Sequence, residues 1–436
     1  MSSTPRVKDS SPGRTYPWVV VGLLWVCGFL NYADRQAVFS VLDLLGQEYS
    51  LNQTQKGWIG SSFMVVYFLS APLAGFVVDR VSRRTLITAG VGLWSLICAA
   101  TGTARSYVEL LVYRAAEGLG ETFYFPASMS LVADYHGRGT RSRAMGLHQT
   151  SVYAGTALGA IAGGFLGQWY GWRSPFWVLG LIGIAYAFVL PWVLVEPKRG
   201  ASDALDNPKP ESDPLAEPLH EETPEALDHG MLVQIGQVVR IPAAVLLLAV
   251  FAGANFVAAT LLAWLPAFVK AQHALDLSKA ATVAGLFFPG GNALGALIGG
   301  TMADFASRRF RGGRVLVQAC GLILGAPCVW IAGHTHDLSV LIPALVGIGL
   351  GKGIYDANIF ASLYDVVPTT VRGTAAGLMN TAGWSLGSLA PALVGWLSDR
   401  YDQGAVIGWT AVVYLFAGLL AMVASGFVAS ARRAVV

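Results

Sequence analysis

The chain has 436 residues, of which 54% are hydrophobic and only 13% are charged, and its mean hydropathy is +0.54. No soluble core of this length needs so apolar a composition, so these values exclude an ordinary soluble domain and indicate a membrane protein. The formal charge of +3 gives little support for nucleic-acid binding, and the four cysteines lie in apolar stretches without the spacing of metal ligands.

Twelve largely apolar runs follow one another along the chain, each long enough to cross a bilayer as a helix, which needs about 20 residues. Helices are expected because lipid cannot satisfy exposed backbone groups, and the runs lack the alternation of barrel strands. The predicted helices span 17–44, 56–78, 85–104, 107–134, 142–168 and 174–195, then 241–270, 277–302, 313–333, 338–366, 371–397 and 406–430.

A stretch rich in Pro, Asp and Glu separates the sixth run from the seventh and predicts a solvated linker. The predicted organisation is a tail (1–16), an N-terminal six-helix bundle (17–197), this linker (198–239), a C-terminal six-helix bundle (240–430) and a second tail (431–436). No signal peptide is expected before the first run. Basic residues concentrate in every second loop between the predicted helices. The positive-inside rule therefore predicts that both termini and the linker lie in the cytoplasm. The protein is expected in an inner or plasma membrane.

A loop motif occurs once in each half of the chain. Gly75-x-x-x-Asp79-Arg80-x-x-Arg83-Arg84 follows the second run. Gly300-x-x-x-Asp304-x-x-x-Arg308-Arg309 follows the eighth, a shift of 225 positions (304 − 79). Such duplication of six helices is typical of transporters.

A second repeat relates the end of the fifth run to the end of the eleventh. Gly164 and Tyr170 recur as Gly395 and Tyr401, a shift of 231 positions (395 − 164). Chance rarely repeats several residue types in register, so the two halves are expected to share one architecture.

Together with Arg114-x-x-x-Gly118-x-Gly120, the loop motifs resemble the signature loops of the major facilitator superfamily over the whole chain. The resemblance implies a monomeric all-α carrier whose two pseudosymmetric six-helix bundles rock around a central cavity. The alternative for the loop arginines is that they are only topology signals. The residues expected to form a latch that breaks during rocking are Gly75, Asp79, Arg80, Arg83, Arg84, Asp304 and Arg308.

Ionisable side chains at membrane depth are costly and therefore predict function. Asp34 and Arg35 interrupt the first run, whereas Arg114, Glu117 and Glu121 share one helical face of the fourth. Burial disfavours an ionised carboxyl group, so Asp34 and Glu121 are predicted to take up protons, with Arg114 and Glu117 completing the set. Arg35 is predicted to grip an anion. The alternative is that these charges only neutralise one another and lock two helices together.

Other polar residues are candidates for the cavity wall. Lys352 and Asp356 lie four positions apart in the tenth run, where they either contact substrate or neutralise each other. His148, Gln149 and Tyr153 of the fifth run are further candidates, with His148 alternatively a packed polar group.

Two groups of carriers share the motif Asn-Tyr-x-Asp-Arg at residues 31–35. With Glu121, Tyr67 and Asn380 it resembles the anion:cation symporters that take up sugar acids with protons. That resemblance implies that Asp34 and Glu121 carry protons and that Arg35, Tyr67 and Asn380 hold the substrate. Val152 departs from it, because the sugar-acid carriers tend to place Gln there.

The same motif, with Arg114 seven residues before Glu121 and Ala-Trp-Leu-Pro at 263–266, also resembles Spinster-like lysolipid and sphingolipid carriers. We therefore expect a proton-coupled symporter of a small organic anion such as a sugar acid, or alternatively a Spinster-like lysolipid carrier. Protons are the expected coupling ion, without a metal or other cofactor. A membrane receptor or lipid-modifying enzyme is the alternative of another class, but no positioned nucleophile or cofactor loop supports an enzyme.

Overall fold

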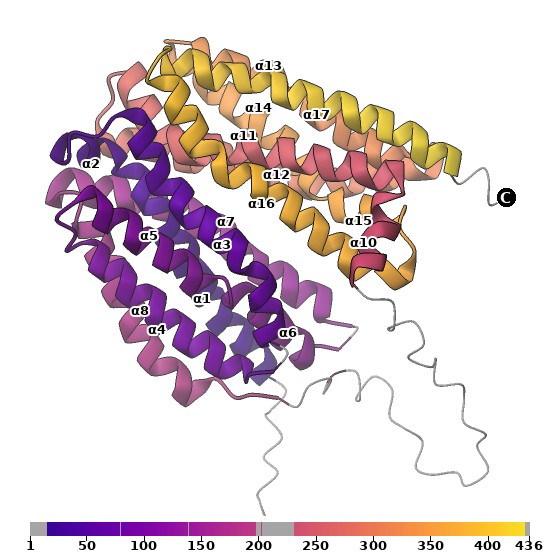
Figure 1. The fold of residues 1–436 in the computed structure, drawn as a ribbon, viewed down its shortest axis with the longest axis horizontal. Coiled ribbons are helices and arrows are strands. Elements are labelled where there is room, and N and C mark those ends of the chain that lie inside the picture. Colours follow the sequence, from indigo (N-terminus) through magenta and orange to yellow (C-terminus); the bar gives the residue numbers. More distant parts are fainter. Residues whose placement is uncertain (1–14, 79, 138, 198–201, 203–230, 432–436) are drawn as a thin grey trace, which may run out of the picture.

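The computed structural model describes residues 15–78, 80–137, 139–197, 202 and 231–431. These residues form helices and no strands, and the helices gather into two bundles (Figure 1). The predicted all-α fold with twelve membrane-crossing segments in two halves is confirmed.

The N-terminal bundle contains all six predicted segments of the first half. Its helices are α1 (Tyr16–Ser40), α2 (Leu42–Glu48), α3 (Gln53–Val78), α4 (Arg83–Thr101), α5 (Tyr107–Glu121), α6 (Tyr124–Tyr135), α7 (Arg141–Tyr170) and α8 (Ser174–Val193). The fourth segment, predicted to be continuous, is broken after Glu121. Pro126 explains the break, because a proline cannot donate to the preceding turn and its ring clashes with the carbonyl four residues earlier.

The C-terminal bundle repeats this plan, including a break in its fourth segment after Asp356. Its helices are α11 (Pro242–Gln272), α12 (Leu277–Arg309), α13 (Gly313–His334), α14 (Leu338–Asp356), α15 (Ile359–Tyr364), α16 (Arg372–Ser398) and α17 (Gln403–Ala431), with the 3₁₀ turn η2 (Thr369–Val371) before α16. A further helix, α10 (Met231–Val239), lies within the range predicted as linker. Apart from residue 202, the rest of that range lies outside the described residues.

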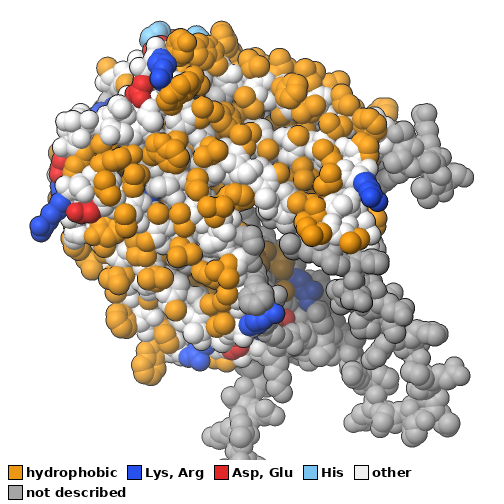
Figure 2. Space-filling model, in the orientation of Figure 1, with side chains coloured by type: hydrophobic (Ala, Val, Ile, Leu, Met, Phe, Trp, Pro, Cys, Tyr) orange, Lys and Arg blue, Asp and Glu red, His pale blue; other side chains and the backbone are white. Residues whose placement is uncertain are grey.

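The flanks of both bundles present apolar side chains. Eight of the described helical segments are long and apolar enough by themselves to cross a membrane. Phe188 and Trp192 of α8 are 73% and 87% exposed, which suits lipid rather than water. In Figure 2, hydrophobic side chains cover the visible flank while charged side chains lie at its ends.

The most extensive contacts between the two bundles join α3 with α16 and α7 with α12, and α1 also contacts α11. In Figure 1 they meet at the side of α2 and diverge toward the side of α6 and α10. We call these the closed side and the open side. Gln36 of α1 donates to the carbonyl of Leu262 at 2.8 Å, which ties the two bundles together.

Glu196 caps the first turn of α4 on the open side. Its carboxylate accepts from the Arg84 amide at 2.6 Å, the Arg83 amide at 3.2 Å and the Ser82 hydroxyl at 2.9 Å. Burial opposes its ionisation, but these bonds outweigh burial and hold the pKa of Glu196 below its usual value. The capped helix is therefore stabilised while Glu196 is ionised.

We expect Glu196→Gln to lower the free energy of unfolding by ~1 kcal/mol at neutral pH. Because the folded pKa is depressed, the Glu196 contribution is present above the ordinary carboxyl pKa and is lost as the pH falls through the folded pKa. Thermal unfolding of both proteins between neutral and acidic pH would measure this. A difference that persists unchanged in acid would contradict the assignment.

Candidate transport site

Five ionisable side chains of the N-terminal bundle lie together at the break in its fourth segment. Asp34 and Arg35 come from α1, whereas Arg114, Glu117 and Glu121 come from α5, and each is at most 7% exposed. The structure thus brings together all the residues that the sequence placed in the first and fourth segments. Among them, three carboxyl groups face two guanidinium groups.

Arg35 is the centre of this cluster. Its Nε donates to Glu121 Oε2 at 3.1 Å, its Nη2 donates to the same oxygen, and Nη2 also donates to Asn31 Oδ1 at 3.2 Å. Glu121 therefore occupies the donors that would otherwise hold an anion. The second oxygen of Glu121, Oε1, has no hydrogen-bond partner.

Aromatic rings surround the Arg35 guanidinium. Its Cζ lies 4.6 Å from the ring centroids of both Tyr32 and Phe63, and 5.0 Å from that of Tyr67. Phe63 also lies 4.9 Å from Arg114 Cζ, so one ring contacts both cations. Such contacts favour a desolvated cation. Phe63 has no charged or polar group that would have selected it in advance, and only its position four residues before Tyr67 places it on the same face.

Arg114 pairs with Glu117 one turn along α5. Both side chains are buried, yet Arg114 Nε, Arg114 Nη2 and Glu117 Oε1 have no hydrogen-bond partners. Buried polar atoms are usually satisfied, and those left without a partner often mark functional sites. The two charges of the pair neutralise each other, while three of its buried polar atoms make no hydrogen bond to the described residues.

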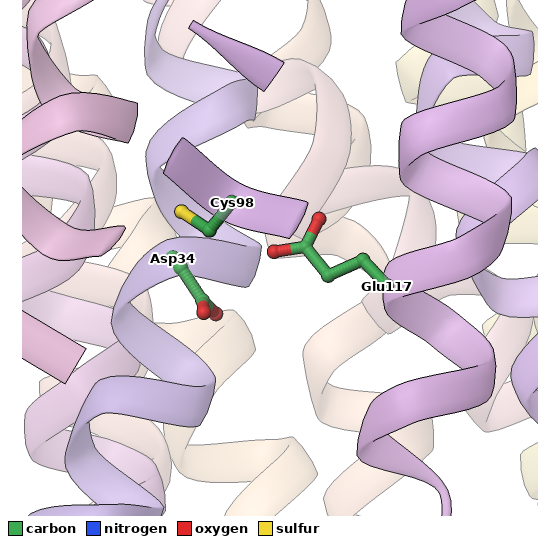
Figure 3. A group of neighbouring side chains, drawn as sticks. All are labelled: Asp34, Cys98 and Glu117. Carbon is green, nitrogen blue, oxygen red and sulfur yellow. The ribbon is translucent and has the colours of Figure 1, made fainter. Parts of the chain in front are cut away.

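A second contact joins the two helices through Cys98 of α4. The carboxyl oxygens of Asp34 and Glu117 and the sulfur of Cys98 lie within 4.8 Å of one another, and Figure 3 shows the Glu117 carboxylate directed at the other two. Two carboxylates and a thiol are also ligand types that a zinc ion accepts. Cys98 is one of the four cysteines in apolar stretches, and its place beside two carboxyl groups was not predicted because the cluster spans three helices.

A small cavity of about 90 Å³ lies between the bundles beside Arg35. Tyr32, Arg35 and Gln36 of α1 line it on one side, and Asn255 of α11 and Trp384 of α16 on the other. Most of the remaining lining is apolar. Arg35 is thus the cationic side chain of this cavity wall.

A larger cavity of about 510 Å³ opens between α3, α10 and α16. Asn380, predicted to bind substrate, lines it among apolar neighbours that include Phe68, Leu378 and Ile235. Trp384 lines both cavities, and its ring contacts that of Tyr67 at a centroid distance of 5.6 Å. The Tyr67–Trp384 pair therefore stands between the buried arginine and the apolar cavity.

The remaining candidates lie elsewhere. Lys352 pairs with Asp356 at 2.5 Å, so the two charges neutralise each other in this conformation. Tyr153 and Gln149 are partly buried side chains of α7. His148 is fully buried and bonds the Tyr124 hydroxyl at 3.0 Å, so it packs inside the N-terminal bundle rather than facing either cavity.

The described loop residues find partners within their own bundles. Arg83 pairs with Asp134 and with Glu196, the latter at 2.9 Å. Arg314 of α13 contacts Asp304 at 3.3 Å and Asp365 at 3.0 Å in the same way. Each of these ion pairs lies within one bundle, and the bundles diverge on this side.

The other predicted latch residues are placed as follows. Arg84 donates to the Pro191 carbonyl, Arg308 is exposed at the end of α12, Gly75 lies in the last turns of α3, and Arg80 follows that helix. Asp79 lies outside the described residues. A latch between the bundles therefore stays a prediction.

Comparison with known proteins identifies the family. The Major Facilitator Superfamily pattern matches residues 24–391. Human protein spinster homolog 1 is 27% identical over 91% of this chain and 75% of its own length. The probable galactarate/D-glucarate transporter GudP of Escherichia coli is 23% identical over 91% of this chain and 90% of its own length.

Solved structures share the fold. A bacterial homologue of the human lysosomal transporter Spinster, inward-facing and unoccupied, superimposes with a TM-score of 0.76 at 22% identity, covering 96% of this chain and 98% of the other. Its occupied inward-facing form gives 0.75 at 20% identity. The chain belongs to the major facilitator superfamily and is a multi-pass membrane transporter, not an enzyme.

Proposed function

We propose that this transporter carries an organic anion by proton-coupled alternating access, with the anion held at Arg35. The observation that carries the proposal is the buried pair in which Glu121 takes the Arg35 donors. A bound carboxylate or phosphate would need those same donors, because a guanidinium binds such groups through its planar fork. Substrate and Glu121 therefore compete for one cation.

The charges in the cluster support protons as the coupling ion. With all five groups ionised, three carboxylates exceed two guanidiniums by one negative charge, and an incoming anion would add another in a buried site. Burying uncompensated charge is costly, so protonation of Glu121 or Asp34 should accompany binding. A protonated Glu121 releases Arg35, while the contact of Asp34 with Glu117 offers a second place for the proton.

The same reasoning extends to orientation and assembly. With both termini in the cytoplasm, the open side faces the cytoplasm and the cavities open inward. Arg83, Arg84, Arg308 and Arg309 all lie on this side, as the positive-inside rule requires. The charged cluster and both cavities are complete without a second copy of the chain, so the carrier is proposed to work as a monomer.

For the substrate, the cavity lining favours an amphiphilic anion, such as a lysolipid, over a sugar acid. Polyhydroxy acids require many polar partners, whereas both cavities are mostly apolar, and Arg35 in the wall of the smaller cavity is the cation of their linings. An anionic head group at Arg35 could extend an apolar tail past Trp384 into the larger cavity. The sugar-acid alternative is supported by the alignment with GudP over nearly its full length.

Thermal stabilisation by ligands separates these alternatives. We expect lysophospholipids to stabilise the purified protein by about 2.7 kcal/mol at a hundredfold excess over Kd. At a given ligand concentration the stabilisation should be larger at acidic than at neutral pH. Galactarate and D-glucarate serve as polar anions, and a neutral monoacylglycerol controls for detergent-like effects. Stabilisation by the sugar acids alone would assign the carrier to polar anions. Equal stabilisation at both pH values would contradict proton coupling.

A further inference from the structure

The first turns of α3 and α12 are capped by residues of the opposite bundle. On α3, the amides of Gln53 and Thr54 donate to the two oxygens of Asp399 at 2.7 Å and 3.1 Å. On α12, the Ser278 amide donates to Gln168 Oε1 at 2.8 Å. Asp399 directly follows α16 of the C-terminal bundle, whereas Gln168 lies in the last turn of α7 of the N-terminal bundle. The bundles therefore exchange caps on the closed side.

The internal repeat relates the two caps to each other. Gln168 and Asp399 differ by 231 positions (399 − 168), the same shift that relates Gly164 to Gly395. Thr54 and Ser278 are each the second residue of their helices and differ by 224 positions (278 − 54), one less than the shift of the loop motif. The caps are thus pseudosymmetric equivalents rather than two unrelated contacts.

The repeated glycines explain how the helix ends come close enough. A Cβ atom added to Gly164 would lie 3.1 Å from the Leu277 carbonyl oxygen, at the start of α12. One added to Gly395 would lie 2.9 Å from the Gln53 carbonyl carbon, at the start of α3. Each glycine stands about one turn before its capping residue, so the pattern Gly-x-x-x-(Gln or Asp) brings one bundle against the helix start of the other.

Each of these two helices also has a capping residue from its own bundle. Only some of the amides in its first turn therefore bond to the opposite bundle. The Asn52 side-chain oxygen accepts from the Gln55 amide at 2.8 Å, and the Gln55 side-chain oxygen accepts from the Asn52 amide at 3.0 Å. Asp276 accepts from the Lys279 amide at 2.9 Å. A helix start has four amides without intrahelical partners, and the local caps satisfy the third helical residue. The amides of Thr54 and Ser278 depend on the other bundle.

An ion pair across the same interface accompanies the caps. Asp43 of α2 contacts Lys270 of α11 at 3.3 Å, and Lys56 of its own bundle at 3.4 Å. All these inter-bundle contacts join groups that separate if the bundles rock apart on the closed side. The amides would then have to exchange their partners for water.

We propose that Asp399 and Gln168 form a reciprocal pair of inter-bundle helix caps that acts as the gate on the closed side. They are positioning residues, which favour the conformation with this side shut. Asp399 is the stronger member, because its carboxylate accepts from two amides and from the Thr54 hydroxyl at the positive end of a helix, whereas Gln168 accepts from one amide. The gate is independent of the substrate and of the coupling ion.

Hydrogen exchange of the purified full chain in lipid nanodiscs tests the gate. Asp399→Ala removes the cap on α3 and is expected to speed amide exchange about fivefold at the start of α3, as loss of a helix cap does. If the two caps open together, exchange also rises about fivefold at the start of α12, which Asp399 does not touch. Gln168→Ala is expected to produce the reciprocal effect at the start of α3, but smaller.

Two further variants separate a gate from local capping. Asp399→Asn keeps one acceptor for the helix start but loses the second oxygen and the negative charge, so it should speed exchange at α3 and α12 less than Asp399→Ala does. Asp402→Ala removes the cap that accepts from Ala405 at 2.9 Å at the start of α17, within one bundle, and should speed exchange only there. Exchange in the middle of α13 reports that each variant is folded. A rise confined to α3 in folded Asp399→Ala, or a rise at α3 and α12 in Asp402→Ala, would overturn the proposal.

Discussion

Glu121→Gln is expected to abolish proton-driven accumulation of the substrate while leaving binding and counterflow intact. Glutamine retains the oxygen that accepts from Arg35 but cannot ionise, so it imitates the protonated carboxyl group. A neutral amide holds the Arg35 donors less tightly than a carboxylate does, so an incoming anion can displace it at every pH. Substrate affinity should lose its pH dependence and should equal or exceed the affinity of the natural protein in acid.

Reconstituted vesicles with an imposed pH gradient would measure accumulation, and the ligand that stabilises the protein in the thermal series would serve as the substrate. Counterflow without a gradient reports whether the carrier still turns over. Glu109→Gln is the matched control, because Glu109 lies in the first turn of the same helix and bonds the Arg105 amide at 2.9 Å outside the cluster. If Glu121→Gln accumulates substrate as fully as Glu109→Gln does, Glu121 is not the coupling site.

Arg35→Lys is expected to weaken substrate binding by about 10- to 100-fold, although the charge is kept. A hydrogen bond to a charged group contributes about 1.5–3 kcal/mol, and lysine cannot reproduce the planar fork of arginine. Lysine also loses the stacked contacts with Tyr32, Phe63 and Tyr67, because its ammonium is compact and strongly hydrated. The site would retain its positive charge but lose the geometry that holds an anion.

Direct binding by calorimetry gives the Kd of each variant. Arg173→Lys is the control, since Arg173 pairs with Glu48 at 2.8 Å and its side chain is 40% exposed, far from the cavities. Both variants should unfold cooperatively. An unchanged Kd in Arg35→Lys would show that the anion is held elsewhere, and Lys352 would be the next residue to test.

Hydrophobic periodicity and composition were sufficient to predict most of the fold. Apolar runs of bilayer length specify helices because lipid offers the backbone no other partners, so the predicted segments and the observed helices coincide closely. The breaks after Glu121 and Asp356 were not predicted. Pro126 can be read from the sequence. Whether a proline kinks a helix, interrupts it or leaves it continuous depends on which neighbouring groups bond the carbonyl that loses its partner.

The candidate site was also predictable only in part. Charge at membrane depth and helical spacing were enough to select Asp34, Arg35 and Glu121, because uncompensated charge in lipid is costly wherever it occurs. The sequence did not indicate which side chains contact these residues. Arg35 is bonded to a residue 86 positions away, and Phe63 and Cys98 carry no charge that would distinguish them from other core residues.

Hydropathy, charge position and internal repeats are properties of the chain alone, and they were enough to predict a duplicated helical carrier with an ionisable cluster in its first half. What the repeats do depends on how the two bundles pack against each other. The pair formed by Gly164 and Gly395 was visible as a pattern, but it became a gate only when each helix end lay against the unsatisfied amides of the opposite bundle. Hydrogen bonds between distant segments depend on distance and direction, and folding sets both.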